Sequence, residues 1–193
     1  PARIRAVSSH LDVTPSLMAL LSNTYGLKRP ARTAWTGSGL DMAQTFRSLT
    51  VNAGQSAILA VSGAAGSMNV MVSNLTRNAG GVLDFTLPAS GAIRTTLTNR
   101  FGILSGALTV GGTDWAAAAG TTPFAVTNFT AYTLAGGGPI ADGNTQNLRL
   151  VGNASLAAAT VGIHTLAVTN DGGAYTISLA GNTLRLGTVG GIL

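Results

Sequence analysis

The sequence contains no cysteine and no glutamate, and Lys28 is its only lysine. The lack of cysteine excludes disulfides and cysteine-ligated metal sites. Glutamate and lysine usually cover the exposed faces of helices, so their near absence argues against a helical protein. Only 9% of the 193 residues are charged and 5% are aromatic. Threonine, serine, asparagine and alanine must therefore cover most of the surface.

The chain also has no apolar run near the roughly 18 residues that a membrane-spanning helix needs. It begins with Pro1 and shows no signal peptide, so we expect a processed product or a segment of a longer protein. What it does contain is 26 glycines and 46% hydrophobic residues. This composition is typical of short strands joined by tight turns.

The net charge of +5 is distributed unevenly. Residues 1–40 hold five Lys and Arg against one Asp, whereas residues 41–193 hold six Arg and five Asp. A nucleic-acid-binding surface needs a dense basic patch interleaved with aromatic residues. Residues 41–193 provide no such patch, so the pattern argues against nucleic acid as a partner.

A short pattern recurs along the chain: two aliphatic residues flank one small or polar residue, and Gly, Asn or Ser closes the unit. This spacing places both aliphatic side chains on one face of a strand. Strands this short are stable only when they stack on others of the same kind. The pattern occurs at Leu49–Val51, Leu59–Val61, Val70–Val72, Leu108–Val110, Leu148–Leu150, Leu166–Val168, Ile177–Leu179 and Leu184–Leu186.

These strands predict an all-β fold, a right-handed parallel β-helix (β-solenoid), over residues 45–193. Two or three strands in a coil of roughly 20–25 residues give about six or seven coils, each rising ~4.8 Å. An antiparallel sandwich produces similar turn spacing, but its core normally holds more aromatic residues. Residues 170–173 (Asn-Asp-Gly-Gly) form either a hairpin turn or a tight corner between two strands.

Residues 1–44 differ from the repeats and form a separate segment. Thr14 followed by Pro15 predicts the start of a helix of about ten residues, which Gly26 ends. This non-solenoid segment either caps the first coil or docks onto a partner.

Several stretches resemble the autotransporter-associated β-strand repeats of bacterial surface and secreted proteins. The resemblance implies a right-handed β-helix and an extracellular or cell-surface location. It implies no catalytic residues. It extends over about residues 45–193 and is carried by Leu75–Pro88 (LTRNAGGVLDFTLP), Gly102–Leu104, Leu108–Ala116 (LTVGGTDWA), Gly181–Leu186 (GNTLRL) and Gly190–Leu193.

The acidic residues offer little catalytic chemistry. Polysaccharide cleavage needs clustered acids, and no two of these lie close in sequence. Their near-regular spacing could align them along one solenoid face, but a single Asp beside glycine is typical of a turn. They are Asp12, Asp41, Asp84, Asp114, Asp142 and Asp171.

The two histidines, His10 and His164, are too few for a metal site, and we expect His164 to occupy a corner. We therefore expect no enzyme activity, no metal and no cofactor.

Two functional classes remain. The first is an extracellular structural protein, the subunit of a surface layer, stalk, sheath or filament. The second is an adhesin or glycan-binding fragment of a larger surface protein. Exposed aromatic residues favour this class, because Trp and Tyr stack on sugars, but Trp35 and Trp115 are too far apart in sequence to define a platform.

The structural interpretation predicts head-to-tail self-association or continuation in a larger chain. The N-terminal arm would contribute Arg3, Arg5 and Val7 to that contact, and Ile192 and Leu193 would lie on an open coil edge.

Overall fold

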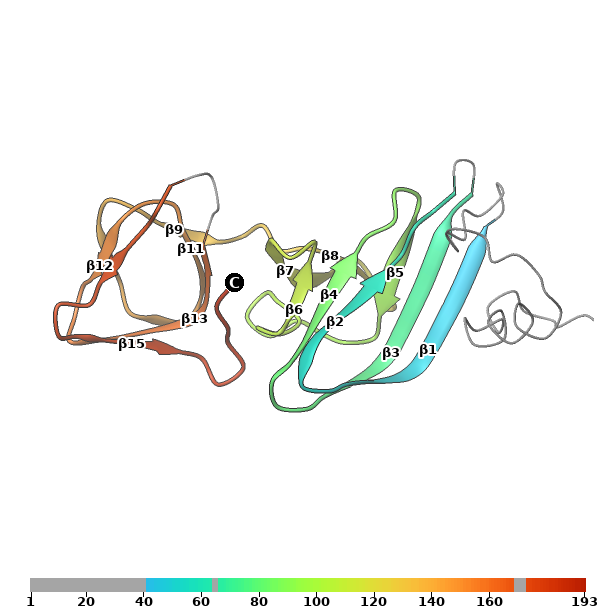
Figure 1. Ribbon diagram of the computed structural model, residues 1–193, viewed down its shortest axis with the longest axis horizontal. Coiled ribbons are helices and arrows are strands. Elements are labelled where there is room, and N and C mark those ends of the chain that lie inside the picture. The colour runs from blue at the N-terminus through green and yellow to red at the C-terminus, as the bar shows by residue number, and fades with distance from the viewer. Residues whose placement is uncertain (1–40, 64–65, 169–172) are drawn as a thin grey trace, which may run out of the picture. The chain divides into compact units, whose positions relative to one another are not determined.

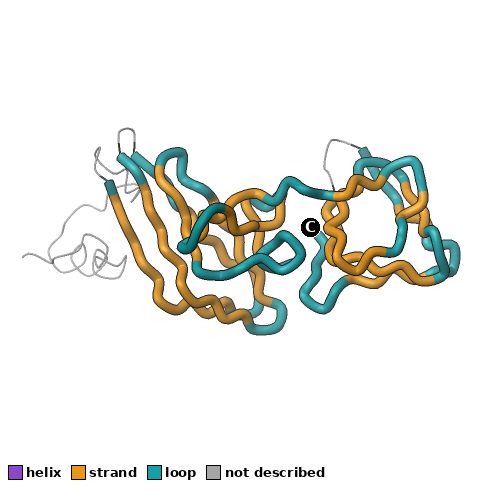
Figure 2. Tube along the Cα trace, turned by 180° about the vertical axis from the view of Figure 1, so that it is seen from behind, coloured by secondary structure: helices purple, strands orange, loops and turns teal. Residues whose placement is uncertain are grey.

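The computed structural model describes residues 41–63, 66–168 and 173–193, which belong to one compact unit. All regular structure in the described residues is β-strand (Figure 2). Stacked parallel coils form the β-solenoid that the sequence predicts. The expected N-terminal helix, together with Arg3, Arg5 and Val7, lies outside the described residues.

The first three coils each contribute one strand to each of two parallel stacks (Figure 1). The strands pair in register, so that Met42 lies beside Met68 and Met68 beside Gly91. One stack consists of β1 (Met42–Val51), β3 (Met68–Arg77) and β5 (Gly91–Thr95); the other consists of β2 (Gly54–Leu59), β4 (Gly81–Thr86) and β6 (Leu108–Val110).

Asparagine and glycine form the corners between these strands, where the sequence predicts turns. Asn78 follows β3, and its side-chain amide donates to the Oδ1 of Asn52 at the corner one coil earlier, over 2.8 Å. Gly80 adopts a positive φ of 77°, which only glycine takes without strain. The two corners therefore stack and hold the coils in register.

The aliphatic pairs of interior coils, such as Val70–Val72 and Leu148–Leu150, point into the solenoid and form ladders. Val70 pairs with Ile93, and Phe85 pairs with Val110. All four side chains are at most 5% exposed and belong to one core cluster. Burial of such ladders is the main stabilising term of the fold.

An antiparallel pair interrupts the solenoid, and the sequence gives no prediction of it. Gly111 and Gly112, both with positive φ, reverse the chain after β6. The chain then forms β7 (Asp114–Ala119), which pairs antiparallel with β6 and with β8 (Phe124–Asn128). β8 in turn pairs antiparallel with β5, so these strands join both stacks into one eight-stranded sheet.

The chain then resumes parallel coils with their own core cluster, which includes Val161 and Ile163. β13 (Thr160–Val168) and β14 (Ile177–Ser178) belong to different sheets, so the two strands do not form a hairpin with each other; residues 169–172 between them lie outside the described residues. In the view of Figure 1 the coils of this part overlie one another and outline a ring. One sheet holds β9 (Thr133–Ala135), β11 (Gly143–Leu150), β13 (Thr160–Val168) and β15 (Thr183–Leu186); the other holds β10 (Pro139–Ile140), β12 (Ala154–Leu156) and β14 (Ile177–Ser178).

Candidate functional site

Three of the described carboxylates accept hydrogen bonds from the following coil. Asp41 accepts from the backbone N–H and the hydroxyl of Ser67, 26 residues later, and these bonds lower the pKa of Asp41. Asp84 accepts from the hydroxyl of Thr109 at 2.7 Å and from a backbone N–H of the glycine turn. Asp142 accepts from the N–H of Gly162, 20 residues later, rather than from its own turn. The carboxylates thus link coils to one another.

The fourth described carboxylate, Asp114, is the centre of a polar cluster that we call the clasp: Asp114, Asn128, Tyr132 and Arg149. Asp114 begins β7 and forms an ion pair with Arg149 of β11. The side-chain amide of Asn128 donates to the other carboxylate oxygen of Asp114 over 3.0 Å. The Arg149 guanidinium lies 3.9 Å from the centroid of the Tyr132 ring, a favourable cation–π geometry. The clasp therefore ties the antiparallel insertion to the later coils.

The electrostatics of the clasp favour fixed charges over proton transfer. Burial opposes ionisation of Asp114, but hydrogen bonds from Asn128 and Arg149 and the charge of Arg149 outweigh it and lower its pKa. Burial raises the pKa of Tyr132, and the negative charge of Asp114 raises it further. Asp114 stays ionised and Tyr132 neutral at ordinary pH. The hydrogen-bond partners of the Asp114 side chain in the clasp are thus an amide and a guanidinium.

An apolar cluster adjoins the clasp and contains Trp115, which is 2% exposed. Ile103 and Phe129 pack in the same cluster, and the backbone N–H of Trp115 donates to the hydroxyl of Tyr132 over 3.0 Å. Trp115 is buried and so cannot offer a stacking face to a sugar. Trp35, the other tryptophan considered for that role, lies outside the described residues.

Ile192 and Leu193 lie beside β13 and extend the last coil. Ile192 forms a parallel bridge with Leu166. The backbone N–H of Leu193 donates to the carbonyl of Leu166 over 2.9 Å, and its carbonyl accepts from the N–H of Val168 over 2.8 Å. The side chain of Leu193 packs against the cluster of Trp115, whereas Ile192 is 66% exposed. The chain places these two sequence-predicted residues together on one coil.

His164 lies inside β13 rather than at a corner, and it is 1% exposed. Its ring meets Phe101 edge-on at 4.9 Å, and its Nε2 atom has no hydrogen-bond partner in the described part of the chain. A short network runs beside it: Thr165 donates to Asn147, and Asn147 donates to the carbonyl oxygen of Phe101 over 2.6 Å. His164 and its neighbours therefore hold the loop of Phe101 against β11 and β13.

Protonation of His164 is expected to destabilise the protein. Burial lowers the pKa of His164, and the positive charge of Arg100 lowers it further, whereas an unfolded histidine titrates near 6.5. Above about pH 6.5 both states are neutral and the stability is complete. As the pH falls below that value the unfolded state gains the proton first, so the unfolding free energy drops by at most about 1.4 kcal/mol per pH unit.

The measurement is urea unfolding followed by circular dichroism at several pH values, with a His164→Gln variant beside the wild type. In the variant the unfolding free energy should no longer fall with pH between about pH 6.5 and 5 through this group. His10 is present in both proteins, so its contribution cancels in the comparison. Equal slopes in the two proteins would show that His164 is not the group responsible.

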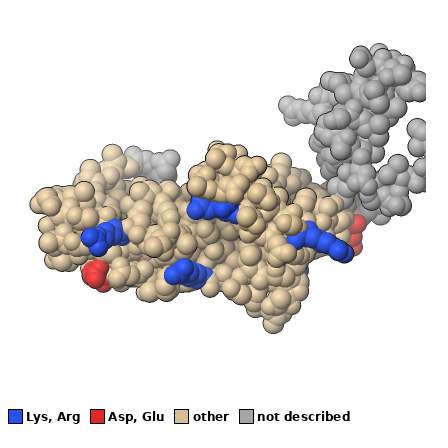
Figure 3. All heavy atoms as spheres, turned by 90° about the horizontal axis from the view of Figure 1, so that it is seen from below, with Lys and Arg blue, Asp and Glu red and all other residues tan. Residues whose placement is uncertain are grey.

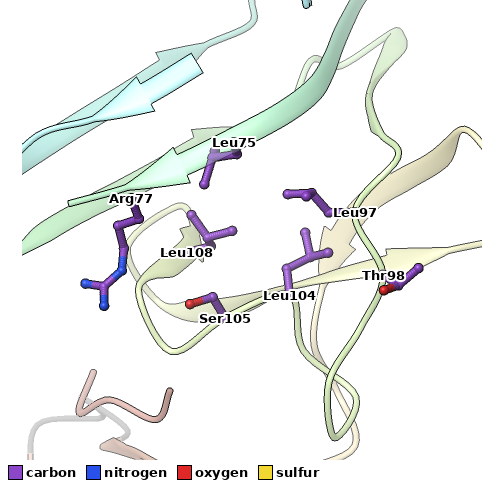
Figure 4. A pocket seen from close by; sticks show the side chains of 7 residues that line it. All are labelled: Leu75, Arg77, Leu97, Thr98, Leu104, Ser105 and Leu108. Carbon is purple, nitrogen blue, oxygen red and sulfur yellow. The ribbon is translucent and has the colours of Figure 1, made fainter. Parts of the chain in front are cut away.

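A pocket of about 280 Å³ lies beside β3, and sequence reasoning missed it (Figure 4). Of its four leucines, the aliphatic pattern of the sequence includes only Leu108. The one signal in the sequence is the long irregular segment between the strands that end at Thr95 and begin at Leu108. The pocket is lined by Leu75, Arg77, Leu97, Thr98, Leu104, Ser105 and Leu108.

No protein-family model, curated protein or solved structure matches this chain. The fold therefore defines its class: a β-solenoid with an antiparallel insertion and polar links between coils. Among the described residues, no three His, Asp or Glu side chains gather where they could hold a metal ion. The same part of the chain contains no helix long and apolar enough to cross a membrane. Similarity to autotransporter-associated repeats stays a prediction.

Proposed function

We propose that this chain is an extracellular structural protein whose solenoid works by end-to-end association with further copies. The observation that carries the proposal is the exposure of apolar ladder positions on the first and last coils. In the first coil, Phe46 is 37% exposed, whereas its partner Val72 on the next coil is 1% exposed. In the last coil, Leu186 is 37% exposed beside Ile163, which is 1% exposed. A further coil stacked on either end would bury the exposed side chain there, Phe46 on the first coil or Leu186 on the last.

The other exposed apolar side chains follow the same distribution. Of the twelve large apolar residues that are exposed in the described part, seven belong to these two coils. Inward-facing residues of interior coils are covered on both sides, whereas an end coil lacks one neighbour. Leu59 is an exception, because it pairs with Thr86 on the outer face, whereas the adjacent Ile58 pairs with the buried Phe85. The seven are Phe46, Leu59 and Val61 in the first coil and Leu179, Leu186, Val189 and Ile192 in the last.

The strand edges at the two ends are complementary. Within the described residues β1 and β2 are the edges at one end, and β14 and β15 are edges at the other. An unpaired edge presents backbone donors and acceptors to another chain. The solenoid stacks are parallel, so the last coil of one copy can pair with the first coil of the next. Such a head-to-tail contact uses two different surfaces and propagates.

The surface charge is low enough for copies to approach closely. Figure 3 shows a face with few charged residues scattered over uncharged surface. The described carboxylates are bonded within the chain, as set out above. The resemblance to bacterial surface repeats and the near absence of Lys and Glu support an extracellular location.

Sedimentation velocity over a wide range of concentration tests this proposal. The wild type should form larger species as the concentration rises. Phe46→Lys should weaken association at least tenfold, because a contact would bury an unpaired charge. The matched control is Val82→Lys on β4, which changes an equally exposed apolar residue of an interior coil, 39% exposed. A wild type that stays monomeric throughout, or a control that dissociates as Phe46→Lys does, would contradict the proposal.

A further inference from the structure

The second half of β3 has no strand on one of its two sides. β1 pairs with β3 from Met68 to Arg77, but β5 pairs only with Met68–Val72. After Thr95 the chain leaves the coil, and the hydroxyl of Thr96 makes a last hydrogen bond to the carbonyl of Ser73. Beyond it, no hydrogen bond joins the backbone of residues 74–77 to residues 97–107, all of which are described. A stretch of strand edge is thus left open inside the sheet.

The leucine-lined pocket lies directly along this open edge. Figure 4 shows four leucine side chains that converge, with Arg77 and Ser105 to one side and Thr98 to the other. Arg77 donates one hydrogen bond, from Nη1 to the carbonyl of Gly81 over 3.1 Å. Its other guanidinium hydrogens have no partner within the described residues. The site therefore combines unpaired backbone groups, an apolar cavity and a positive charge. The four leucines are Leu75, Leu97, Leu104 and Leu108.

We propose that this site binds an extended peptide segment of another protein. The segment adds as a strand along residues 74–77, places one aliphatic side chain among the leucines and presents a carboxylate to Arg77. Strand addition joins main-chain hydrogen bonds with a pocket for alternate side chains, and both elements are present here. A simple amphipathic anion would fill the cavity but would leave the backbone edge unpaired. The site lies on the second and third coils, and none of its lining residues is among those proposed for the end-to-end contact. The two regions adjoin, because Gly106, next to Ser105 of the pocket, donates a backbone hydrogen bond to Val189 of the last coil over 3.0 Å.

The probe is the peptide Thr-Val-Leu-Thr-Asp with fluorescein on its N-terminal amine and an amidated C-terminus, measured by fluorescence anisotropy with the full chain. Two altered peptides leave the protein unchanged. Replacing the leucine with serine should weaken binding at least tenfold, because it removes the burial of one aliphatic side chain. Methylation of one backbone nitrogen of the peptide, chosen because it would donate to β3, should weaken binding about fivefold. Absence of saturable binding, or equal binding of all three peptides, would overturn the proposal.

Matched protein variants locate the site. Arg77→Gln should weaken binding about threefold and abolish the preference for Asp over Asn at the last peptide position. Arg47→Gln on β1 removes an exposed charge from a neighbouring strand and should leave binding unchanged. Leu104→Trp should fill the cavity and block the peptide. Octanoate is the comparison ligand: if octanoate saturates the site and the peptide does not bind, the site is one for small amphiphiles and the proposal is wrong.

Discussion

Replacing Ile93 with alanine is expected to lower the unfolding free energy by about 2–5 kcal/mol. Ile93 is completely buried, pairs with Val70 on the preceding coil and belongs to the core cluster of the first coils. Truncation removes three carbons and leaves a cavity between stacked coils that cannot collapse without breaking the strand register. Urea unfolding followed by circular dichroism measures the loss.

Two further variants calibrate this prediction. Ile93→Val removes a single methylene and should cost about 0.5–1.5 kcal/mol. Val82→Ala alters an exposed apolar residue of the same coil system, 39% exposed, and should change the unfolding free energy by less than about 1 kcal/mol. If Ile93→Ala lowered the unfolding free energy no more than Val82→Ala does, the placement of Ile93 in an inward-facing ladder would be wrong.

Replacing Arg149 with methionine should cost about 2–3 kcal/mol. The side chain pairs with Asp114, covers the Tyr132 ring at 3.9 Å and reaches the carbonyl of Thr113 at 3.4 Å. Because Arg149 and Asp114 are 26% and 19% exposed, the pair lies between a surface ion pair worth under about 1 kcal/mol and a buried one worth about 3–5. Methionine keeps much of the apolar stem but leaves the carboxylate without its cation.

Arg47→Met is the control for Arg149→Met, since Arg47 is exposed on β1 and forms no ion pair within the described residues. It should change the unfolding free energy by less than about 0.5 kcal/mol. Combining Arg149→Met with Asp114→Asn should cost less than the sum of the two changes, because both remove the same interaction. Additive losses would mean that the clasp does not act as a unit.

The sequence predicts the interior coils well because its signal is local. Each aliphatic pair in Val70–Val72 and Leu148–Leu150 is buried, as a strand period of two requires. The same pattern at Leu59–Val61 is exposed, 68% and 51% for the two aliphatic residues. Ala60, between these two residues, is 2% exposed, and Leu59 pairs with Thr86 on the outer face. The pattern therefore states which residues share a face but not which face points inward.

The antiparallel insertion was not predictable for a related reason. Ala116–Ala119 carries no alternation, so neither strand direction nor face can be derived from it. The Gly111-Gly112 turn was visible as a break, but a break does not say whether the next strand continues the solenoid or reverses against it.

The clasp required three-dimensional information. Asp114 and Arg149 are 35 residues apart, and many Asp–Arg pairs in the chain have comparable separations. Their pairing depends on the insertion that the sequence left undetermined. The carboxylates were interpreted as turn residues, and Asp142 shows that a coil gives such a residue a second partner, the N–H of Gly162 on the next coil.

The most direct test of end-to-end association is a mixing experiment with Phe46→Lys and Ile192→Lys. Each variant has one damaged end and one intact end, and each should remain monomeric alone. Mixed in equal amounts, they should form a discrete dimer through the two intact ends and grow no further, as sedimentation velocity can establish. A mixture that stays monomeric, or a single variant that dimerises by itself, would contradict the head-to-tail account.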